Sequence, residues 1–379
     1  MPRLPVRTRA LPHKYEITIG RGTLRDVGQV ARDCLGERSQ RLALISNRKV
    51  FSLYGRTVME VLQAQNFSVS SWLIDEGESQ KSLRTLASAL QFLTDTGLQR
   101  SDGVVALGGG VVGDLAGFAA AVYLRGVPLI QVPTTLLAQV DSSVGGKTGV
   151  NLAAGKNLVG SFHQPQAVVV DLETLTTLPK RELTAGLCEC VKQGAVGSRK
   201  LFKQTNDFLL ESRSPANLTF PQLEQLIAAH CAFKAAIVSG DERESLVRTD
   251  RRSRKILNFG HTIAHALETV TSYRKFRHGE AVGHGMLVAA ELSKNLGLLA
   301  QSELELLRGA IERCGPLPFA GDLDEGELIK AIAHDKKRAA GRLQWILLER
   351  IGRPRILDGG DVSPALLRRS LRAAFKKRK

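Results

Sequence analysis

The segment 258–280, NFGHTIAHALETVTSYRKFRHGE, contains three histidines. His261 and His265 are four residues apart in a stretch with the pattern of a helix, so both imidazoles should project from one face. His278 follows a connection rich in Tyr, Arg and Lys that could fold back over that face. Catalytic zinc usually takes three protein ligands and keeps one position open for water or substrate oxygens. The segment therefore predicts a metal site with an acid/base beside it, whereas His261 and His265 alone would fit a packed or solvated pair equally well.

A glycine cluster follows an apolar run earlier in the chain. GVVAL leads into GGGVVGDLAG, which contains the pattern GxGxxG at Gly108, Gly110 and Gly113 and then opens a predicted helix. Glycines let the backbone approach phosphates, and the amides at a helix start favour negative charge, so a dinucleotide pyrophosphate is expected here. The ordinary fingerprint lies in the first strand–helix unit and has an acid about 20 residues later. Neither holds in this chain, which disfavours an ordinary Rossmann dehydrogenase.

Two further lysines are flanked by glycine, Lys147 in GGKT and Lys156 in GKN, among Thr, Ser and Asn side chains. The full phosphate-loop pattern GxxxxGK[ST] is absent, because Asp141 stands where its first glycine would be. Hydrolysis of a nucleoside triphosphate is therefore disfavoured. A site that holds the phosphate and carboxylate of a small anion fits these residues better.

The elements that must position these residues differ between two halves of the chain. Up to about residue 178, short β-branched runs alternate with helical stretches, which predicts a Rossmann-like α/β domain with a parallel sheet. After it, long amphipathic runs dominate and predict a mostly α-helical domain. The expected domains are 1–178 and 179–379.

The composition limits the possible partners. The chain has 379 residues and a formal net charge of +16, which favours an anionic ligand. Only 5% of residues are aromatic and no basic run is interleaved with aromatics, so nucleic acid is not expected. The odd number of scattered cysteines, the missing apolar core of a signal peptide and the lack of a membrane-spanning run predict a cytoplasmic protein without a membrane partner.

Several blocks of this chain occur in the order and spacing seen in the 3-dehydroquinate synthases of the shikimate pathway, a family of sugar phosphate cyclases that the chain closely resembles. The resemblance runs from about residue 15 to about residue 357 and rests on GGGVVGDLAGFAAAVYLRGVPLIQVPTTLLAQVDSSVGGKTGVN, GKNLVGSFHQP, GLCECVKQG, ILNFGHTIAHALE and HGEAVGHGM. It implies a lyase that acts on 3-deoxy-arabino-heptulosonate 7-phosphate with NAD and zinc or cobalt. NAD would bind to the N-terminal α/β domain, and the metal and substrate to the C-terminal helical domain. Transient oxidation, phosphate elimination, reduction and an intramolecular aldol closure would give 3-dehydroquinate.

The resemblance also implies roles for individual residues. The metal ligands would be Glu189, His261 and His278, with His265 as the acid/base. A Cys188 and Cys190 metal pair is disfavoured, because residues two apart on a helix point away from each other. The implied substrate contacts are Arg125 from the second subunit of a homodimer, Asp141, Lys147, Asn157, Lys192, Lys234, Arg254, Asn258 and a lysine of DKK, Lys336 or Lys337. The implied NAD contacts are Glu78, Lys81, Gly110, Val111, Val112, Gly113, Asp114, Thr134, Thr135, Lys147, Lys156, Thr174, Leu175, Thr176 and Thr177.

The chain departs from the family pattern in a few places. A basic insertion at about 245–253 leaves Arg251 and Arg252 as alternatives to Arg254, although the spacing to His261 favours Arg254. Gln193 stands where the family often has tyrosine. Three alternatives to the main interpretation remain: another sugar phosphate cyclase such as a 2-epi-5-epi-valiolone synthase, a metal-dependent glycerol-type dehydrogenase, and a basic protein that kept the fold but lost activity.

Overall fold

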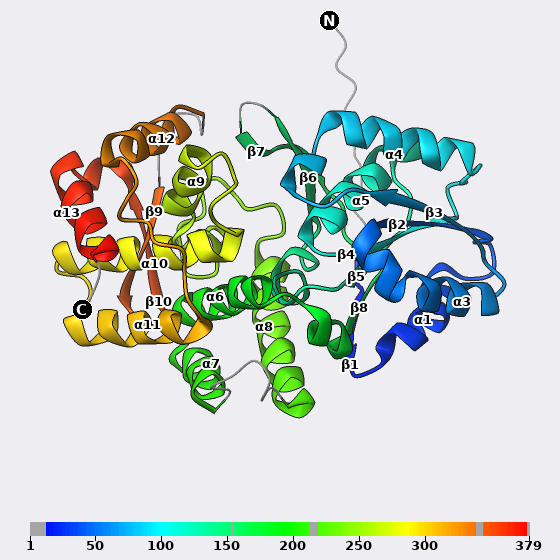
Figure 1. Cartoon of the computed structure of the whole chain (residues 1–379), viewed down its shortest axis with the longest axis horizontal. Coiled ribbons are helices and arrows are strands. Elements are labelled where there is room, and N and C mark those ends of the chain that lie inside the picture. Colours follow the sequence, from blue (N-terminus) through cyan, green and yellow to red (C-terminus); the bar gives the residue numbers. More distant parts are fainter. Residues whose placement is uncertain (1–12, 153–154, 212–218, 339–343, 377–379) are drawn as a thin grey trace, which may run out of the picture.

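The computed structural model describes residues 13–152, 155–211, 219–338 and 344–376 (Figure 1). Its N-terminal part is built on a six-stranded sheet in the order β1-β8-β5-β4-β2-β3, in which every pairing is parallel. The strands are β1 (Glu16–Gly20), β2 (Arg41–Asn47), β3 (Ser68–Ile74), β4 (Gly103–Gly108), β5 (Leu129–Pro133) and β8 (Ala167–Asp171). The central strands β4, β5 and β8 are buried throughout, as expected for a parallel sheet covered on both faces. The predicted α/β architecture is confirmed.

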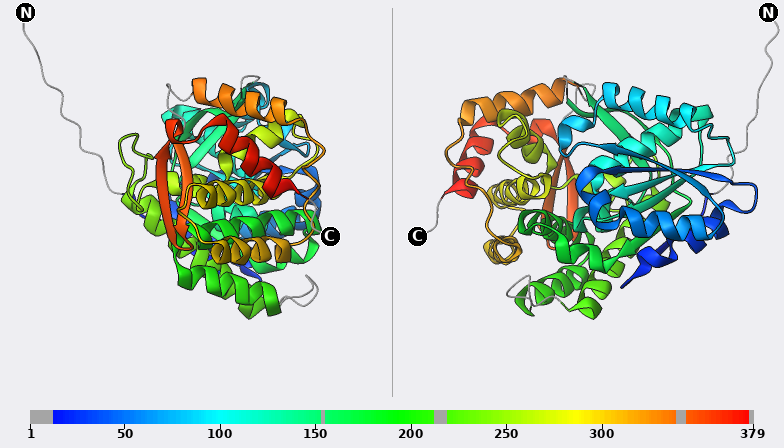
Figure 2. Two further views of the ribbon diagram at one scale, coloured as in Figure 1. Left: turned by 90° about the vertical axis from the view of Figure 1, so that its left-hand side faces the viewer. Right: turned by 45° about the vertical axis from the view of Figure 1, so that its right-hand side comes forward.

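Helices cover the two faces of this sheet (Figure 2). On one face, α1 (Val27–Leu35) and α3 (Arg56–Ala64) pack in a core that includes Leu44. On the other face, α4 (Leu83–Asp95) and α5 (Gly110–Val122) pack in a core that includes Ile45. Leu44 and Ile45 are neighbours in β2 and point to opposite faces, which follows from the two-residue period of a strand.

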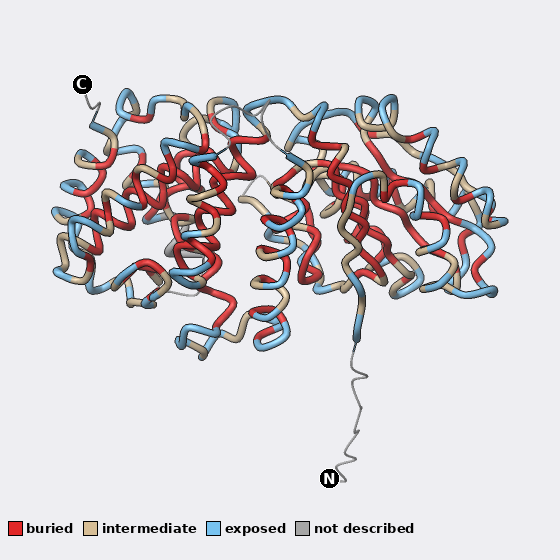
Figure 3. Tube along the Cα trace, turned by 90° about the horizontal axis from the view of Figure 1, so that it is seen from below, coloured by how far each residue is buried: buried red, intermediate tan, exposed pale blue. Residues whose placement is uncertain are grey.

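The C-terminal part is mostly helical, as predicted. Its elements are α6 (Lys180–Gly197), α7 (Arg199–Glu211), α8 (Phe220–Gly240), α9 (His261–Val270), α10 (His278–Asn295), α11 (Gln301–Cys314), α12 (Glu325–Arg338), α13 (Pro364–Phe375) and the antiparallel hairpin of β9 (Gln344–Arg350) and β10 (Arg353–Asp358). Helix α10 is buried from Gly279 to Ser293 and contacts α6, α9, α11 and α13. Figure 3 shows buried residues running through the interior of both parts.

Glycines let α10 approach its neighbours closely. A Cβ atom at Gly279 would lie 2.0 Å from the carbonyl oxygen of Ala185 in α6, and one at Gly285 would lie 2.0 Å from that of Gly260. Gly260 precedes α9 with a left-handed φ of 81°. The glycines of HGEAVGHG therefore fix how α6, α9 and α10 meet.

A second hairpin lies outside the main sheet and carries two of the predicted lysines. Strands β6 (Lys147–Leu152) and β7 (Gly155–Phe162) pair antiparallel, and β6 packs on α5. One hydrophobic core cluster extends from Leu136 and Val140 into α6, α8 and α10. The two parts therefore share a core, and the domain boundary at 178/179 stays a prediction.

Candidate active site

Three helices bring together a group of side chains with metal-ligand chemistry. Glu189 lies in α6, while His261 and His278 are the first residues of α9 and α10. One ligand atom from each residue lies within 4.8 Å of the others. Within the part of the chain that the structure describes, these are the residues that offer three metal-ligand atoms so close together. We call Glu189, His261 and His278 the metal group.

Hydrogen bonds orient both histidines of the metal group. His261 Nδ1 lies 3.3 Å from the carbonyl oxygen of Phe259, and His278 Nδ1 lies 3.2 Å from Glu268 Oε1. Both partners accept hydrogen bonds, so each Nδ1 carries a proton and each Nε2 is the nitrogen left to bind a metal. His278 Nε2 faces Glu189 Oε1 at 3.8 Å. This is the tautomer that a metal-binding histidine needs.

The electrostatics of the group also fit a divalent cation. Glu189 is fully buried, its Oε2 lies 2.5 Å from Lys192 Nζ, and its Oε1 has no hydrogen-bond partner among the described residues. Buried carboxylate oxygens normally have partners, so this oxygen is suited to a cation. Burial, with the charge of Lys192, lowers the pKa of His261 well below its usual value and keeps the imidazole neutral. Burial opposes protonation of His278, but Glu268 raises its pKa, so this imidazole would release a proton on binding a metal. Two imidazoles and one carboxylate match a catalytic zinc-type donor set.

His265 lies beside the metal group rather than within it. Its ring centroid is 5.6 Å from that of His261 and 6.3 Å from that of His278. Cys188 and Cys190 instead pack in the hydrophobic core. A hydrogen bond with Cys314 and burial raise the pKa of Cys188, and burial raises that of Cys190, which disfavours the thiolates that a metal would require.

A cluster of buried charges adjoins the metal group. Asp141, in a π-helical turn (Ala138–Ser142), lies 2.6 Å from Lys234 Nζ of α8. Burial opposes ionisation of Asp141, but Lys234 and Lys192 hold its pKa below the usual value. Gln193 Nε2 also donates to Asp141 Oδ1 at 3.4 Å and to the carbonyl of Val140 at 2.9 Å. Gln193 thus helps to position an ionised carboxylate next to two lysines.

The structure favours Arg254 over the arginines of the insertion. Arg254 is 2% exposed and donates to the carbonyl oxygens of Gly145 at 2.8 Å and Glu242 at 2.6 Å. Arg251 and Arg252 are exposed. Most of the inserted residues are exposed, with Leu246 88% exposed, and they precede the 3-10 helix 254–258.

Glu244 connects two predicted substrate contacts and was not identified from the sequence. It forms an ion pair with Lys147 Nζ, and its Oε1 accepts from Asn258 Nδ2 at 2.8 Å. Glu268 was also missed, although it follows His261 by seven residues and His265 by three in one helix, a spacing that puts all three on one face.

The glycine cluster forms the start of α5, as predicted. Gly109 precedes the helix without a side-chain cap, so the first amides, from Gly110 onward, have no partner within the helix. A Cβ atom at Gly113 would lie 2.8 Å from Gln131 Oε1, so this glycine lets α5 pack against β5. We call residues 109–114 the nucleotide loop. The amides of its first residues, which have no partner within the helix, suit a pyrophosphate.

The predicted threonines lie at the carboxyl ends of the neighbouring strands. Thr134 and Thr135 follow β5, and the stretch 174–177 follows β8 in a 3-10 helix. Thr134 Oγ1 is buried and has no hydrogen-bond partner among the described residues. Ligands of open α/β sheets bind at this edge, so a partnerless hydroxyl beside the nucleotide loop fits NAD. The side chains of Val112 and Leu175 are buried, so these two residues would contact NAD through their backbone atoms.

Charged residues link the nucleotide loop to the β6–β7 hairpin. Lys81 Nζ lies 2.6 Å from Asp114 Oδ2 and 2.5 Å from Asn157 Oδ1. Burial raises the pKa of Asp114, although Lys81 opposes that shift. Lys156 Nζ lies 3.5 Å from Glu78 Oε1. These predicted contacts, far apart in the sequence, therefore form one polar network.

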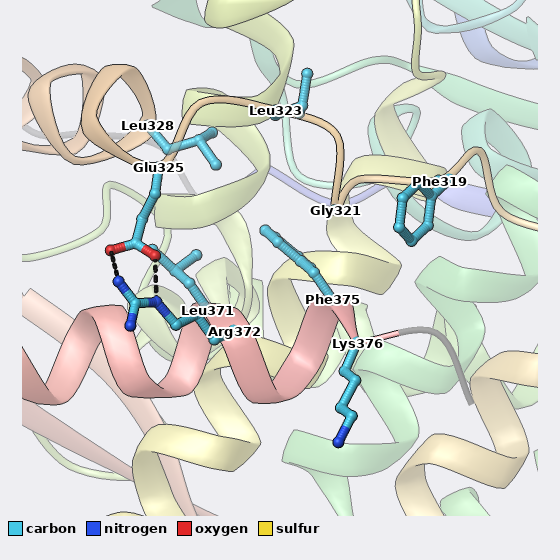
Figure 4. A pocket seen from close by; sticks show the side chains of 9 residues that line it. All are labelled: Phe319, Gly321, Leu323, Glu325, Leu328, Leu371, Arg372, Phe375 and Lys376. Carbon is cyan, nitrogen blue, oxygen red and sulfur yellow. Dashed lines mark hydrogen bonds and ion pairs between the residues drawn. The ribbon is translucent and has the colours of Figure 1, made fainter. Parts of the chain in front are cut away.

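Two predicted residues are not placed with the others. Arg125 is exposed, has a left-handed φ of 68°, and forms no hydrogen bond or ion pair with other predicted site residues in the described part of the chain. Lys337 belongs to α12, but its side chain, like that of Lys336, lies outside the described residues. A separate pocket of about 310 Å³ between α13 and the segment 319–328 contains none of the predicted residues (Figure 4).

Comparison with known proteins agrees with this arrangement. The family models for the N-terminal and C-terminal parts of 3-dehydroquinate synthase match residues 71–185 and 186–338. A 3-dehydroquinate synthase from Synechococcus sp. (strain CC9605) is 42% identical over 350 residues, which is 92% of each chain. One from Symbiobacterium thermophilum is 42% identical over 366 residues, 95% of this chain and 98% of the relative.

Solved structures of other sugar phosphate cyclases are similar in fold. A 2-epi-5-epi-valiolone synthase from Streptomyces hygroscopicus subsp. jinggangensis 5008, with NAD⁺ and Zn²⁺ bound, has a TM-score of 0.82 and 26% identity over 97% of this chain and 98% of that one. A 2-deoxy-scyllo-inosose synthase complexed with carbaglucose-6-phosphate, NAD⁺ and Co²⁺ has a TM-score of 0.81 and 28% identity, covering 94% and 96%. The two matching family models together span most of the chain, including the metal group and the nucleotide loop, and the chain belongs to the 3-dehydroquinate synthase family.

Proposed function

We propose that this protein is a 3-dehydroquinate synthase, which converts 3-deoxy-arabino-heptulosonate 7-phosphate to 3-dehydroquinate and phosphate. The observation that carries the proposal is the convergence of the metal group, the Asp141–Lys234–Lys192 cluster and the nucleotide loop in a chain that is 42% identical to 3-dehydroquinate synthases. Each provides one requirement of that reaction.

Two bound groups are part of the proposal. Glu189, His261 and His278 would hold a zinc or cobalt ion, which supplies a Lewis acid for substrate hydroxyls. The amides of the nucleotide loop and the hydroxyl of Thr134 would hold NAD, which supplies a reversible hydride acceptor. Similar solved cyclases carry these groups.

The protein's own residues would bind the substrate and move protons. Ionised Asp141 would accept hydrogen bonds from sugar hydroxyls, and the buried cations Lys192, Lys234 and Arg254 would bind the phosphate and carboxylate. Elimination requires that the C6 proton leaves and that the C7–oxygen bond to phosphate breaks. His265, beside the metal group, is suited to carry a proton during turnover.

The other interpretations have less support. Identity is 26% and 28% to the valiolone-type and inosose-type cyclases, against 42% to 3-dehydroquinate synthases. A probable glycerol dehydrogenase from Sinorhizobium meliloti shares 15% identity, which shows a common fold alone. A glycerol-type substrate would also leave the buried lysines without an anion.

Phosphate release tests the proposal directly. The protein is assayed with 3-deoxy-arabino-heptulosonate 7-phosphate and with sedoheptulose 7-phosphate, each with and without NAD⁺ and after chelation. Release from the carboxylated sugar alone, dependent on NAD⁺ and metal, is expected. Release from the heptulose alone would instead assign a valiolone-type cyclase, and release from neither would overturn the proposal.

We also propose that the protein acts as a homodimer in which Arg125 of one subunit contacts substrate in the other. Arg125 is exposed and separate from the other site residues of its own chain, which agrees with action across an interface. Mixing the inactive variants Arg125→Ala and His265→Ala should restore up to about a quarter of wild-type activity, because half of randomly mixed dimers have one intact site. No recovery after subunit exchange would contradict this role.

A further inference from the structure

Glu268 connects the metal group to the hairpin that carries a predicted nucleotide contact. Its side chain is 2% exposed, in α9. Two donors converge on the single oxygen Oε1: Nδ1 of His278 at 3.2 Å and Nζ of Lys156 at 2.9 Å. Lys156 belongs to β7 in the N-terminal part, and Glu268 and His278 to the C-terminal part.

The surroundings of Glu268 favour a positioning role over simple ion pairing. Helix α9 supplies both His261 and Glu268, seven residues apart and so on one face. Because His278 Nδ1 is bound to Glu268, its Nε2 is turned toward Glu189. Lys156 in turn reaches Glu78, another predicted nucleotide contact, at 3.5 Å. A continuous polar path therefore runs from Glu189 to Glu78 through Glu268.

We propose that Glu268 is a positioning residue that holds His278 for metal binding and couples the metal group to nucleotide binding through Lys156. The inference rests on the proposed ligand set and on the NAD site of the proposed function. A carboxylate that accepts from the second nitrogen of a metal-binding histidine fixes its orientation and raises its basicity. Since the same oxygen holds Lys156, occupation of one site changes the affinity of the other by a reciprocal factor.

The first test measures metal affinity without turnover. Wild type, Glu268→Gln and Glu268→Asp are stripped of metal and titrated with Co²⁺, whose visible absorption reports the ligand geometry. We expect Glu268→Gln to weaken Co²⁺ binding about 10- to 100-fold and to alter the spectrum, with Glu268→Asp between it and wild type. Glu291→Gln is the matched control, because Glu291 is a buried carboxylate in α10 that pairs with Arg308, and it should bind Co²⁺ as wild type does.

The second test measures coupling. NAD⁺ affinity is determined by calorimetry with and without Co²⁺ in wild type and in Glu268→Gln, at Co²⁺ concentrations that saturate each protein. Wild type should show a difference of about fivefold or more, and Glu268→Gln less than about twofold. Circular dichroism confirms that the variants are folded.

The outcomes separate this inference from the proposed function. Unchanged Co²⁺ affinity in folded Glu268→Gln would overturn the positioning role, and equal coupling in wild type and Glu268→Gln would overturn the link through Lys156. These titrations use no sugar substrate. If phosphate release failed but the expected affinities were found, the proposed reaction would be wrong and the role of Glu268 would stand.

Discussion

The nucleotide loop and the metal group are built in different ways. The loop offers backbone amides of consecutive residues at the start of α5, immediately after β4. The metal group takes one side chain from each of α6, α9 and α10, and its members span positions 189 to 278. The loop therefore depends on local chain geometry, whereas the metal group depends on how three helices pack. Substitutions should be able to damage one site and spare the other.

The largest effect is expected from the metal ligands themselves. Glu189→Gln and His278→Ala should each lose the bound metal, and phosphate release should fall by about a thousandfold or more because several kcal/mol of charge stabilisation are lost. Metal analysis of the purified variants checks this, with His13→Ala, an exposed histidine, as control. Full metal content in both variants would show that the ligands are wrongly assigned.

Helix packing should affect the metal group alone. In Gly279→Ala the new Cβ atom would lie 2.0 Å from the Ala185 carbonyl oxygen, so α10 must move away from α6. We expect a loss of about 1–3 kcal/mol of stability and weaker Co²⁺ binding, with unchanged NAD⁺ affinity in the absence of metal. Gly360→Ala is the control, because its Cβ would meet nothing within 4 Å. If NAD⁺ affinity fell as much as Co²⁺ affinity, the expectation that helix packing affects the metal group alone would be wrong.

The nucleotide loop should respond in the opposite way. Gly113→Ala would place a Cβ atom 2.8 Å from Gln131 Oε1 and disturb the bond from Gln131 Nε2 to the Gly113 carbonyl oxygen. NAD⁺ affinity should fall about fivefold, the equivalent of one hydrogen bond of about 1 kcal/mol. Calorimetry measures it, and Co²⁺ affinity without NAD⁺ is expected to remain at the wild-type value.

The last effect concerns the stability of the protein rather than its bound groups, and arises in the polar network behind Asp141. His230 is fully buried between Gln193 Oε1 and Thr205 Oγ1, both 3.0 Å away, and burial lowers its pKa from 6.5 to about 3. Below pH 6.5, His230 therefore binds a proton in the unfolded chain but not in the folded protein. The free energy of unfolding falls as the pH drops below 6.5. Between pH 7 and pH 5 the loss from His230 is about 2 kcal/mol.

Urea unfolding at both pH values tests this dependence. In His230→Asn the stability lost between pH 7 and pH 5 should be smaller than in wild type by about 2 kcal/mol. An identical pH dependence in the two proteins would mean that His230 does not titrate as proposed.

Local patterns were predictable from the sequence. The β4–loop–α5 unit and the helix with His261 and His265 follow from glycine spacing and from hydrophobic periods, which neighbouring residues define. The metal ligands, in contrast, came from resemblance to a family, and the structure places them together without testing each role. The β6–β7 and β9–β10 hairpins were not foreseen, because both lie outside the parallel sheet that the alternating pattern predicts.

By itself the sequence determined the α/β and helical parts, the uncapped glycine turn before α5, and the one-turn spacing of His261 and His265. Only the tertiary structure decided which distant residues are in contact. Glu189 lies close to His278. Glu244 binds both Lys147 and Asn258, and Glu268 accepts hydrogen bonds from His278 and Lys156. The physical reason is distance along the chain. Backbone dihedrals fix contacts within a turn or two, whereas contacts between distant residues depend on close packing at positions such as Gly279 and Gly285.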